Sequence, residues 1–311
     1  MLSIVIPVFN ERESLPHLWK EINHVLSDAS EWEIIFIDDG SSDGTTEYLV
    51  DLCKNNSVAK LIQFYRNFGK SAALSEGFNH AQGDIIITMD GDLQDDPAEI
   101  PHLIKKLEDG YDLVSGWKKM RHDPWTKTFP SKIFNIVTRL LTGVKVHDFN
   151  CGLKCYRQAV VKSLEIFGGR HRYIPALAGQ KNFRVGEIVI NHRPRKYGKT
   201  KYGGLRLFHG FFDLMTILFL NRYTQQPLHL FGVFGLITFI FGLISEFVVL
   251  YYKFRIGDPF SKHIALLIFG VMLMVIGIQF FSIGLLGEMM ARTGQGQENR
   301  IKEIISSSDS S

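Results

Sequence analysis

The sequence predicts an α/β domain with a mostly parallel sheet, followed by a pair of membrane-spanning helices. β-rich runs alternate with segments of helix-like apolar spacing in the first half of the chain, which is typical of parallel sheets covered by helices on both faces. The expected strands are residues 3–8, 33–37, 59–64 and 84–89, and the expected helices are 14–26, 44–54 and 71–80. Polar residues follow these strands, where ligands bind in such sheets. Near the C-terminal end, two long apolar runs predict the membrane part.

Composition narrows the class of protein. The 311 residues are 45% hydrophobic with a net charge of +3, which is too small a charge to indicate a nucleic-acid partner. The three cysteines, Cys53, Cys151 and Cys155, form no disulfide framework and indicate a reducing compartment. The chain begins at once with a strand and no signal-peptide pattern, so we expect the first domain in the cytoplasm.

The two apolar runs predict a hairpin across a membrane. Residues 230–252 contain one charge, Glu246, and residues 264–287 contain none. Each run is long enough to cross a bilayer of about 30 Å. The loop at 253–263 is less basic than the segment before the first run, so the positive-inside rule places the large domain in the cytoplasm. We therefore expect a multi-pass membrane protein whose large domain lies in the cytoplasm.

Two further segments have the pattern of surface helices. Residues 132–144 have helical apolar spacing that fits either a core-facing or a membrane-surface helix. Residues 205–220 are unusually aromatic, which favours a helix at the membrane interface. Glu246 could line an acceptor path, although a hydrogen bond to Gln279 or another subunit is the favoured interpretation. The expected divisions are 1–202 catalytic, 203–228 interfacial, 229–290 transmembrane, and 291–311 a partly disordered tail.

Acidic residues follow two of the expected strands. Asp90-Gly-Asp-Leu-Gln94 comes directly after an apolar strand, and its oxygen ligands suit Mg²⁺ or Mn²⁺ held against a diphosphate. Asp38-Asp-Gly-Ser-Ser-Asp-Gly44 predicts a turn and a helix N-cap. One of its aspartates is also suited to accept hydrogen bonds from a nucleotide base. The sequence thus predicts a site for a nucleotide with its metal ion.

Four motifs in order carry a family resemblance. They are Ile4-Val-Ile-Pro-Val-Phe-Asn-Glu11, Ile37-Asp-Asp-Gly-Ser-Ser-Asp-Gly-Thr45, Arg66-Asn-Phe-Gly-Lys70 and Asp90-Gly-Asp-Leu-Gln94. The chain resembles the family 2 glycosyltransferases with the GT-A fold, and more narrowly the polyprenyl-phosphate glycosyltransferases. The resemblance extends from the first strand to the second apolar run.

The resemblance implies a set of site residues. The catalytic residues would be Asp90, Asp92 and Asp148, and the metal ligands would be Asp92 and Gln94. The acceptor phosphate would meet Lys118, Lys127 and Ser131. The nucleotide would be bound by Pro7, Phe9, Glu11, Asp39, Lys70, Asp90, Gly91, Arg195 and Lys201.

The resemblance also implies a reaction. A hexose would pass from a nucleotide-sugar to polyprenyl phosphate with inversion, for cell-envelope glycan or glycoprotein modification. UDP-glucose is the favoured donor, with GDP-mannose or another UDP-sugar as alternatives, and undecaprenyl phosphate is the favoured acceptor. The lipid phosphate is already ionised and needs no strong base, so stabilising the leaving diphosphate is the difficult part. A metal ion with Arg195 and Lys201 would do this. The resemblance further implies a multi-pass protein of the bacterial inner membrane, which could form a homo-oligomer.

The sequence argues against three other classes of protein. A processive polysaccharide synthase would need a Gln-x-x-Arg-Trp motif, and Gln180-Lys-Asn-Phe-Arg184 has the wrong spacing and no Trp. A haloacid-dehalogenase-type phosphatase carries its Asp-x-Asp after the first strand, whereas here it follows the fourth. A non-enzymatic membrane scaffold would not require acidic residues after successive strands.

Overall fold

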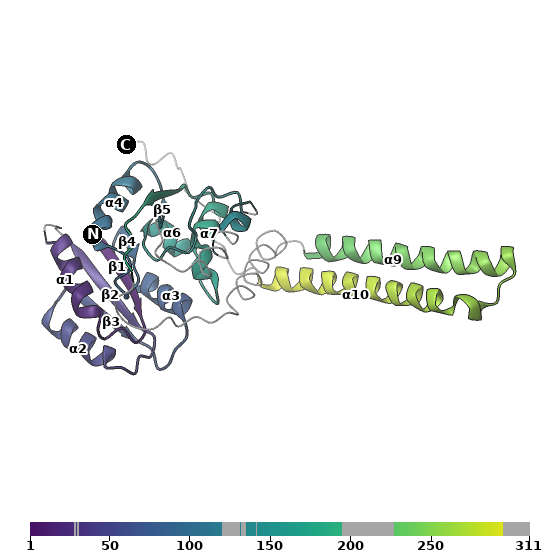
Figure 1. Cartoon of the computed structure of the whole chain (residues 1–311), viewed down its shortest axis with the longest axis horizontal. Helices are drawn as coiled ribbons and strands as arrows, with labels where there is room; N and C mark the ends of the chain where they lie inside the picture. The colour runs from purple at the N-terminus through teal and green to yellow at the C-terminus, as the bar shows by residue number, and fades with distance from the viewer. Residues whose placement is uncertain are drawn as a thin grey trace, which may run out of the picture. The chain divides into compact units, whose positions relative to one another are not determined.

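The computed structural model describes residues 1–27, 29, 31–119, 131, 135–140, 142–194 and 227–294. The chain divides into two compact units, Met1–Met215 and Thr216–Ser311. The first is an α/β domain and the second contains two long helices, as the ribbons in Figure 1 show. The α/β domain followed by two apolar helices is the architecture that the sequence predicts.

The described strands of the first unit form one mixed sheet. The order across the sheet is β3-β2-β1-β4-β6-β5-β7. β1 to β4 are mutually parallel where they pair, and β5 pairs parallel with β7. β6 runs antiparallel to both its neighbours, β4 and β5. The strands are β1 (Leu2–Val8), β2 (Trp32–Asp38), β3 (Ala59–Gln63), β4 (Ile85–Thr88), β5 (Leu113–Trp117), β6 (Lys154–Arg157) and β7 (Val185–Val189).

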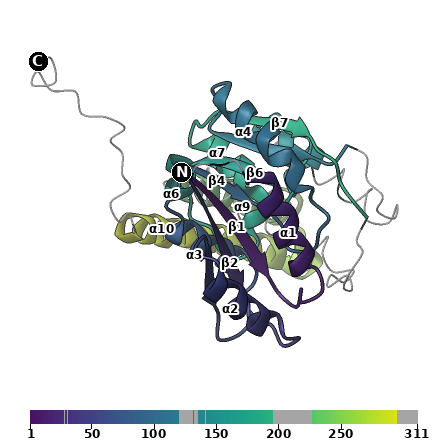
Figure 2. The same cartoon turned by 90° about the vertical axis from the view of Figure 1, so that its left-hand side faces the viewer.

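Helices cover both faces of this sheet because the strands are apolar on both sides. In β1, Ile4 and Ile6 pack into one buried cluster while Val5 packs into the other. The first cluster takes side chains from α1 (Leu15–Val25), α2 (Thr45–Asn55) and α4 (Ile100–Glu108). The second takes them from α3 (Lys70–His80), α6 (Gln158–Ser163) and α7 (Ile174–Gln180). Figure 2 shows α1 and α3 lying on opposite sides of the strands.

The four strands and three helices expected before residue 90 are confirmed, each within about two residues at either end. The segment at 132–144 is described at 135–140, which is helical, and at 142–144. There Asn135 and Thr138 are buried, while Ile136, Val137 and Leu140 are exposed. The apolar side chains at these positions therefore face outward, which is the pattern of the membrane-surface alternative rather than of a core-facing helix. The expected interfacial helix at 205–220 lies outside the described residues.

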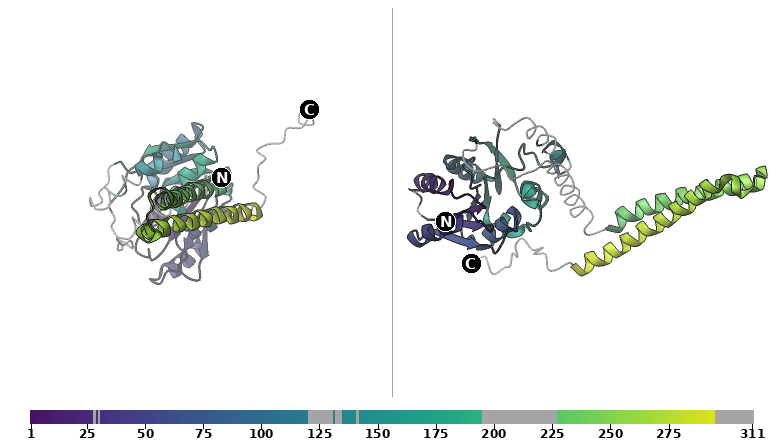
Figure 3. Two further views of the ribbon diagram at one scale, coloured as in Figure 1. Left: turned by 90° about the vertical axis from the view of Figure 1, so that its right-hand side faces the viewer. Right: turned by 60° about the horizontal axis from the view of Figure 1, so that its bottom comes forward.

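The second unit is a hairpin of two long helices, α9 (Pro227–Tyr251) and α10 (Ile264–Gly294). Both views in Figure 3 show the two helices side by side. A π-helical turn at Tyr252–Ile256 and a 3₁₀ turn at Phe260–His263 join them. The spans Pro227–Ile256 and Phe260–Met290 are long and apolar enough to cross a membrane. They contain the two runs that the sequence singles out.

Glycines bring the two helix backbones into contact. A Cβ atom at Gly242 would lie 2.6 Å from the carbonyl oxygen of Gly270, and one at Gly235 would lie 2.7 Å from that of Gly277. Small residues at these positions allow the close approach that stabilises helix pairs in lipid. The carboxyl group of Glu246 is directed at this interface, since a Cβ at Gly270 would collide with its Oε1.

Candidate active site

The loops after β1 and β2 are tied together at the carboxyl edge of the sheet. The backbone N–H of Asn10 donates to Ser41 Oγ at 2.9 Å, and that of Glu11 donates to Thr45 Oγ1 at 3.0 Å. Ser14 Oγ lies 3.1 Å from Glu11 Oε2 and donates to the carbonyl oxygen of Gly91 at 2.7 Å. Through Ser14, these contacts join Glu11 to Gly91 in the loop that follows β4, and both are predicted nucleotide-binding residues.

Asp39 fixes the loop that leads into α3. Its carboxylate accepts the backbone N–H of Phe68 at 2.6 Å and that of Gly69 at 2.9 Å. Asp39 is 4% exposed, and burial raises the pKa of its carboxyl group despite these hydrogen bonds. Gly40 is required beside it, because its φ is +76° and a Cβ there would meet Arg66 backbone carbon at 2.6 Å. Asp39 therefore anchors the 66–70 segment, which ends at Lys70.

Asp90 follows β4 and forms an ion pair with Lys70 at the start of α3. Burial opposes ionisation of Asp90, but the charges of Lys70 and Lys118 outweigh it and hold its pKa well below the usual range. Gly152 packs against the same carboxylate, and a Cβ on it would lie 2.5 Å from Asp90 Oδ2. The charged form of Asp90 is thus stabilised, in a position that a larger residue at 152 would disturb.

Asp92 and Gln94 form a tight turn after Asp90. The backbone N–H of Gln94 donates to Asp92 Oδ1 at 3.1 Å. Leu93 between them has φ +61°, a left-handed conformation that is rare for residues other than glycine. Such strain is typical of functional sites, where the surrounding structure holds it in place. Asp92 is 8% exposed, so little of this residue on the turn is accessible to solvent.

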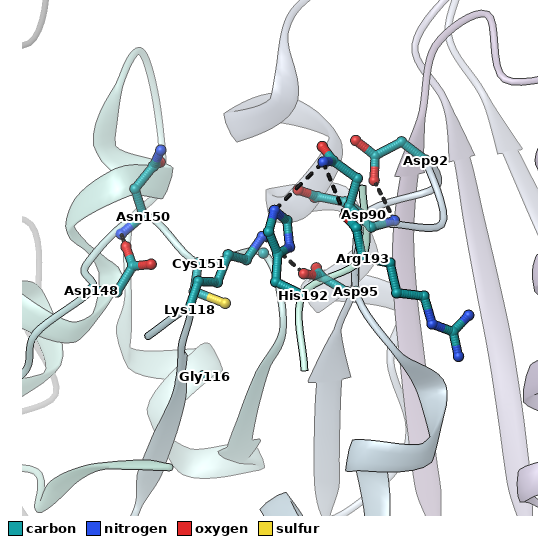
Figure 4. Close-up of polar contacts among 12 residues, drawn as sticks. Asp90, Asp92, Asp95, Gly116, Lys118, Asp148, Asn150, Cys151, His192 and Arg193 are labelled. Carbon is teal, nitrogen blue, oxygen red and sulfur yellow. Dashed lines mark hydrogen bonds and ion pairs between the residues drawn. The ribbon is translucent and has the colours of Figure 1, made fainter. Parts of the chain in front are cut away.

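Lys118, a predicted acceptor-phosphate residue, is largely shielded from solvent. Its Nζ is 2.9 Å from Asp95 Oδ1, and the two side chains are 14% and 0% exposed. Burial lowers the pKa of Lys118, but the charge of Asp95 more than offsets this and raises it overall. Figure 4 shows Lys118, Asp95 and His192 gathered together. In this conformation Lys118 neutralises a buried carboxylate.

Asp148 lies on the β5 side of the site. It is 1% exposed, its Oδ1 accepts the backbone N–H of Asn150 at 3.2 Å, and its carbonyl oxygen accepts Ser115 Oγ–H at 3.3 Å. Figure 4 shows Asp148 and Asn150 together. Pro7 is within β1 and Ser131 is half-buried. Lys127, Arg195 and Lys201 lie outside the described residues.

Sequence reasoning missed two polar residues beside Asp90, the buried Lys154 and the half-buried His171. Lys154 is 3% exposed, and its Nζ donates to the carbonyl oxygen of Cys151. Burial lowers the pKa of Lys154 and, together with nearby lysines, that of His171; His171 Nδ1 lies 2.8 Å from Ser71 Oγ. Both line a cavity of about 10 Å³ with Lys70 and Asp90, room for one water molecule. The basic residue four positions after Asn150 was the available signal for Lys154.

The protein oxygens after β4 fit a divalent cation that is shared with a substrate, rather than one that the protein holds alone. Among the described residues, no three His, Cys, Asp or Glu side chains lie close enough together to hold a metal ion. Asp92 and Gln94 provide a carboxylate and an amide oxygen on one turn, and Gln94 Oε1 has no hydrogen bond to a described residue. Mg²⁺ and Mn²⁺ sites of this kind use one or two protein oxygens and complete the shell with substrate phosphates and water. The residues present fit such a shared site.

Comparisons with known proteins identify the family. Residues 3–165 match "Glycosyl transferase family 2". The chain is 38% identical over 301 residues to a dodecaprenyl-phosphate galacturonate synthase of Rhizobium johnstonii, covering 94% of this chain and 88% of that protein. It is 36% identical to an undecaprenyl-phosphate 4-deoxy-4-formamido-L-arabinose transferase of Salmonella choleraesuis, with the same coverage. The chain belongs to glycosyl transferase family 2, and it is an enzyme that transfers a sugar.

Solved structures support the fold. Glucosyl-3-phosphoglycerate synthase of Mycobacterium tuberculosis, in complex with Mn²⁺ and uridine-diphosphate-glucose, aligns with a TM-score of 0.55 at 17% identity. The alignment covers 71% of this chain and 78% of that one. The predicted GT-A fold is confirmed. Because the chain belongs to glycosyl transferase family 2, it is neither a non-enzymatic scaffold nor a haloacid-dehalogenase-type phosphatase.

Proposed function

We propose that the protein transfers a sugar from a nucleoside diphosphate sugar to the phosphate of a polyprenyl lipid, with inversion at the anomeric carbon. The proposal rests on the combination of an acidic site and a membrane hairpin in one chain. It has an acidic site at the carboxyl edge of a GT-A sheet, centred on Asp90 and Asp92, and a hairpin of two candidate membrane spans. Two relatives that match nearly the whole chain carry polyprenyl phosphates in their names.

The donor would lie across the ends of β1, β2 and β4. Asp39 and Glu11 border the region proposed for the base and ribose, and both belong to loops held by hydrogen bonds. The Lys70–Asp90 ion pair lies at the centre of this edge, where its ammonium group can attract the diphosphate. Arg195 and Lys201 are proposed to close over the same group. The donor would then be oriented by groups that need little rearrangement.

The acceptor phosphate would approach from the side of Asp148, Ser131 and Lys127. One of its oxygens attacks the anomeric carbon, a new C–O bond forms, and the bond to the diphosphate breaks with its electron pair on the leaving group. No proton has to be removed from an ionised phosphate, so the chain needs to supply position and positive charge rather than a strong base. Lys118 would contribute positive charge while it remains paired with Asp95.

A divalent cation fits the donor end of this arrangement. Mg²⁺ or Mn²⁺ held by Asp92 and Gln94 would neutralise the charge that develops on the diphosphate. The exposed apolar side chains of Ile136, Val137 and Leu140 support a domain that rests on a lipid surface. We place the catalytic domain on the cytoplasmic side of a bacterial inner membrane, where nucleotide-sugars are made.

The identity of the sugar follows from a direct test. Membranes containing the protein would be incubated with undecaprenyl phosphate and labelled donors, then extracted with organic solvent. The panel would include UDP-glucose, GDP-mannose, UDP-galacturonate and a UDP-4-deoxy-4-formamidoarabinose. We expect one donor to give an acid-labile lipid-linked sugar in wild-type membranes and none in an Asp92→Ala control. Label in a long polymer, or none in lipid with any donor, would contradict the proposal.

A further inference from the structure

The segment that follows the Asp-x-Asp turn is held from both sides. Asp95 pairs with the buried Lys118 at the end of β5, and Asp96 accepts Arg193 Nη2–H at 2.7 Å. The backbone N–H of Arg193 donates to the carbonyl oxygen of Gln94 at 2.9 Å, and Asp95 and His192 form an antiparallel bridge. Arg193 is itself anchored to Glu21 at 2.7 Å. Gln94 is therefore seated on a backbone that cannot shift without breaking several contacts.

The side chain of Gln94 also has a determined orientation. Its Nε2 lies 3.4 Å from the carbonyl oxygen of Arg193 and 3.5 Å from His192 Nε2. A carbonyl oxygen can only accept hydrogen bonds, so the end of the amide that faces Arg193 must be the NH₂ group. The same nitrogen lies next to His192 Nε2, which accepts its second N–H in the tautomer that carries the imidazole proton on Nδ1. Each contact is long, but the two act on the same NH₂ group.

We propose that His192 is a positioning residue for the cation site: with the Arg193 carbonyl group, it holds the amide nitrogen of Gln94 inward so that the oxygen faces the cation. The inference rests on the divalent cation of the proposed function. Gln94 Oε1 has no hydrogen bond to a described residue, while the NH₂ group lies next to the Arg193 carbonyl oxygen and His192 Nε2. An amide presents a ligand atom at only one of its two ends, so a rotated amide would direct N–H groups at the cation.

His192 is placed for this role by its burial and its position in the chain. It is 7% exposed and comes 98 residues after Gln94, just before the basic segment proposed to close over the diphosphate. Groups that orient metal ligands are worth about 10- to 100-fold in metal affinity. Asp95 and Asp96 also acquire a role, since their ion pairs hold the backbone on which the amide is presented.

The test measures Mn²⁺ binding rather than transfer. Full-length protein in detergent would be titrated with Mn²⁺ in the presence of UDP, with free Mn²⁺ followed by electron paramagnetic resonance. We expect His192→Phe to weaken Mn²⁺ binding by about tenfold or more, with UDP binding in EDTA unchanged. His192→Val serves if the phenyl ring does not fit. The matched control is His102→Phe on α4, where the side chain is 70% exposed and pairs with Glu99.

A second background separates orientation of the amide from support of the fold. Both terminal atoms of a glutamate are oxygens, so the Gln94→Glu background needs no group to select the correct end. We expect His192→Phe to weaken Mn²⁺ binding less than about threefold there, well below the effect that groups orienting a metal ligand usually have. An equal loss in both backgrounds, or no loss in the Gln94 background, would overturn the role of His192.

The outcome for the wild-type protein distinguishes this inference from the proposed function. A wild-type protein that binds no Mn²⁺ or Mg²⁺ would overturn both the cation site and the role of His192. Normal Mn²⁺ binding in the His192→Phe variant would overturn the role of His192 alone. Transfer to lipid phosphate, measured separately, tests the reaction itself.

Discussion

At the scale of single residues, the Asp90–Gln94 turn combines charge with backbone strain. Asp90 and Asp92 could be predicted because they directly follow an apolar strand, where a parallel sheet places its ligands. The left-handed Leu93 could not, since nothing in its side chain favours that conformation. Lys154 and His192 were also missed, because contacts with segments far along the chain give them their surroundings. Sequence reasoning thus found the residues on the turn and missed the residues that support it.

The first residue-scale prediction concerns Asp92. We expect Asp92→Ala to lower the rate of transfer at least about 100-fold, the size of effect found when one charge-stabilising group is removed. The protein should stay folded, because the carboxylate accepts the N–H of Gln94, which belongs to the same local turn. Removing divalent cations with EDTA should abolish transfer reversibly in the wild-type protein. Full activity in EDTA would contradict the cation site.

A second prediction uses the ionisation of Asp96. Burial opposes its charge, but the N–H of Ala98 and the guanidinium of Arg193 hold the pKa of the Asp96 carboxyl group below its usual value. A lowered folded-state pKa adds stability above the unfolded-state value, and this stability is lost as pH falls through the folded-state value. Asp96→Asn should therefore lower the melting temperature at pH 7 by a few degrees, about the effect of 1 kcal/mol.

The difference in melting temperature between wild type and Asp96→Asn should shrink as pH falls below about 4. Asp109→Asn is the matched control, because Asp109 is 58% exposed in its pair with Lys106 and should change stability little at any pH. A difference that stays constant with pH would show that the ion pair with Arg193 is not its origin.

At the scale of elements, apolar periodicity was sufficient wherever one face of a segment packs on the core. It placed the first four strands and three helices, since α1 buries Leu15, Leu18 and Ile22 along one stripe. For the helix at 135–140, the same periodicity could not decide between a core-facing helix and a membrane-surface helix. Its apolar side chains are exposed, and periodicity alone reports that a stripe exists without reporting what covers it.

The glycine contacts of the hairpin lead to an element-scale prediction. Gly242→Ala would place a methyl group 2.6 Å from the carbonyl oxygen of Gly270, so the helices would have to separate. We expect a loss of about 1–3 kcal/mol, measured as a lower melting temperature in detergent. Gly232→Ala is the matched control, because its nearest neighbour would be Leu228 Cδ1 at an ordinary 3.5 Å. Equal stability of the two variants would argue against tight packing of these helices.

At the scale of the whole molecule, the order of the strands in the sheet could not be predicted from the sequence. β6 is inserted between β4 and β5 and runs antiparallel to both. Nothing in the four residues Lys154–Arg157 specifies that position, because it depends on long-range pairing. The insertion matters for the site, since it carries Gly152 and Lys154 to Asp90. The division into a sheet domain and an apolar hairpin, in contrast, followed directly from composition.

The last prediction tests whether these two parts are separable in function. Every residue proposed for the donor lies at or before Lys201, and the described hairpin begins at Pro227. A chain cut after Tyr202 should therefore be soluble and should bind the nucleotide with about wild-type affinity, measured by calorimetry. It should transfer poorly to a long polyprenyl phosphate, because the acceptor would no longer be held at the height of the site. A short, water-soluble prenyl phosphate should partly restore transfer, since it can diffuse in.

Loss of nucleotide binding in a folded fragment would mean that the C-terminal part helps to build the donor site. Wild-type rates on the long lipid in detergent would mean that the C-terminal part only anchors the enzyme.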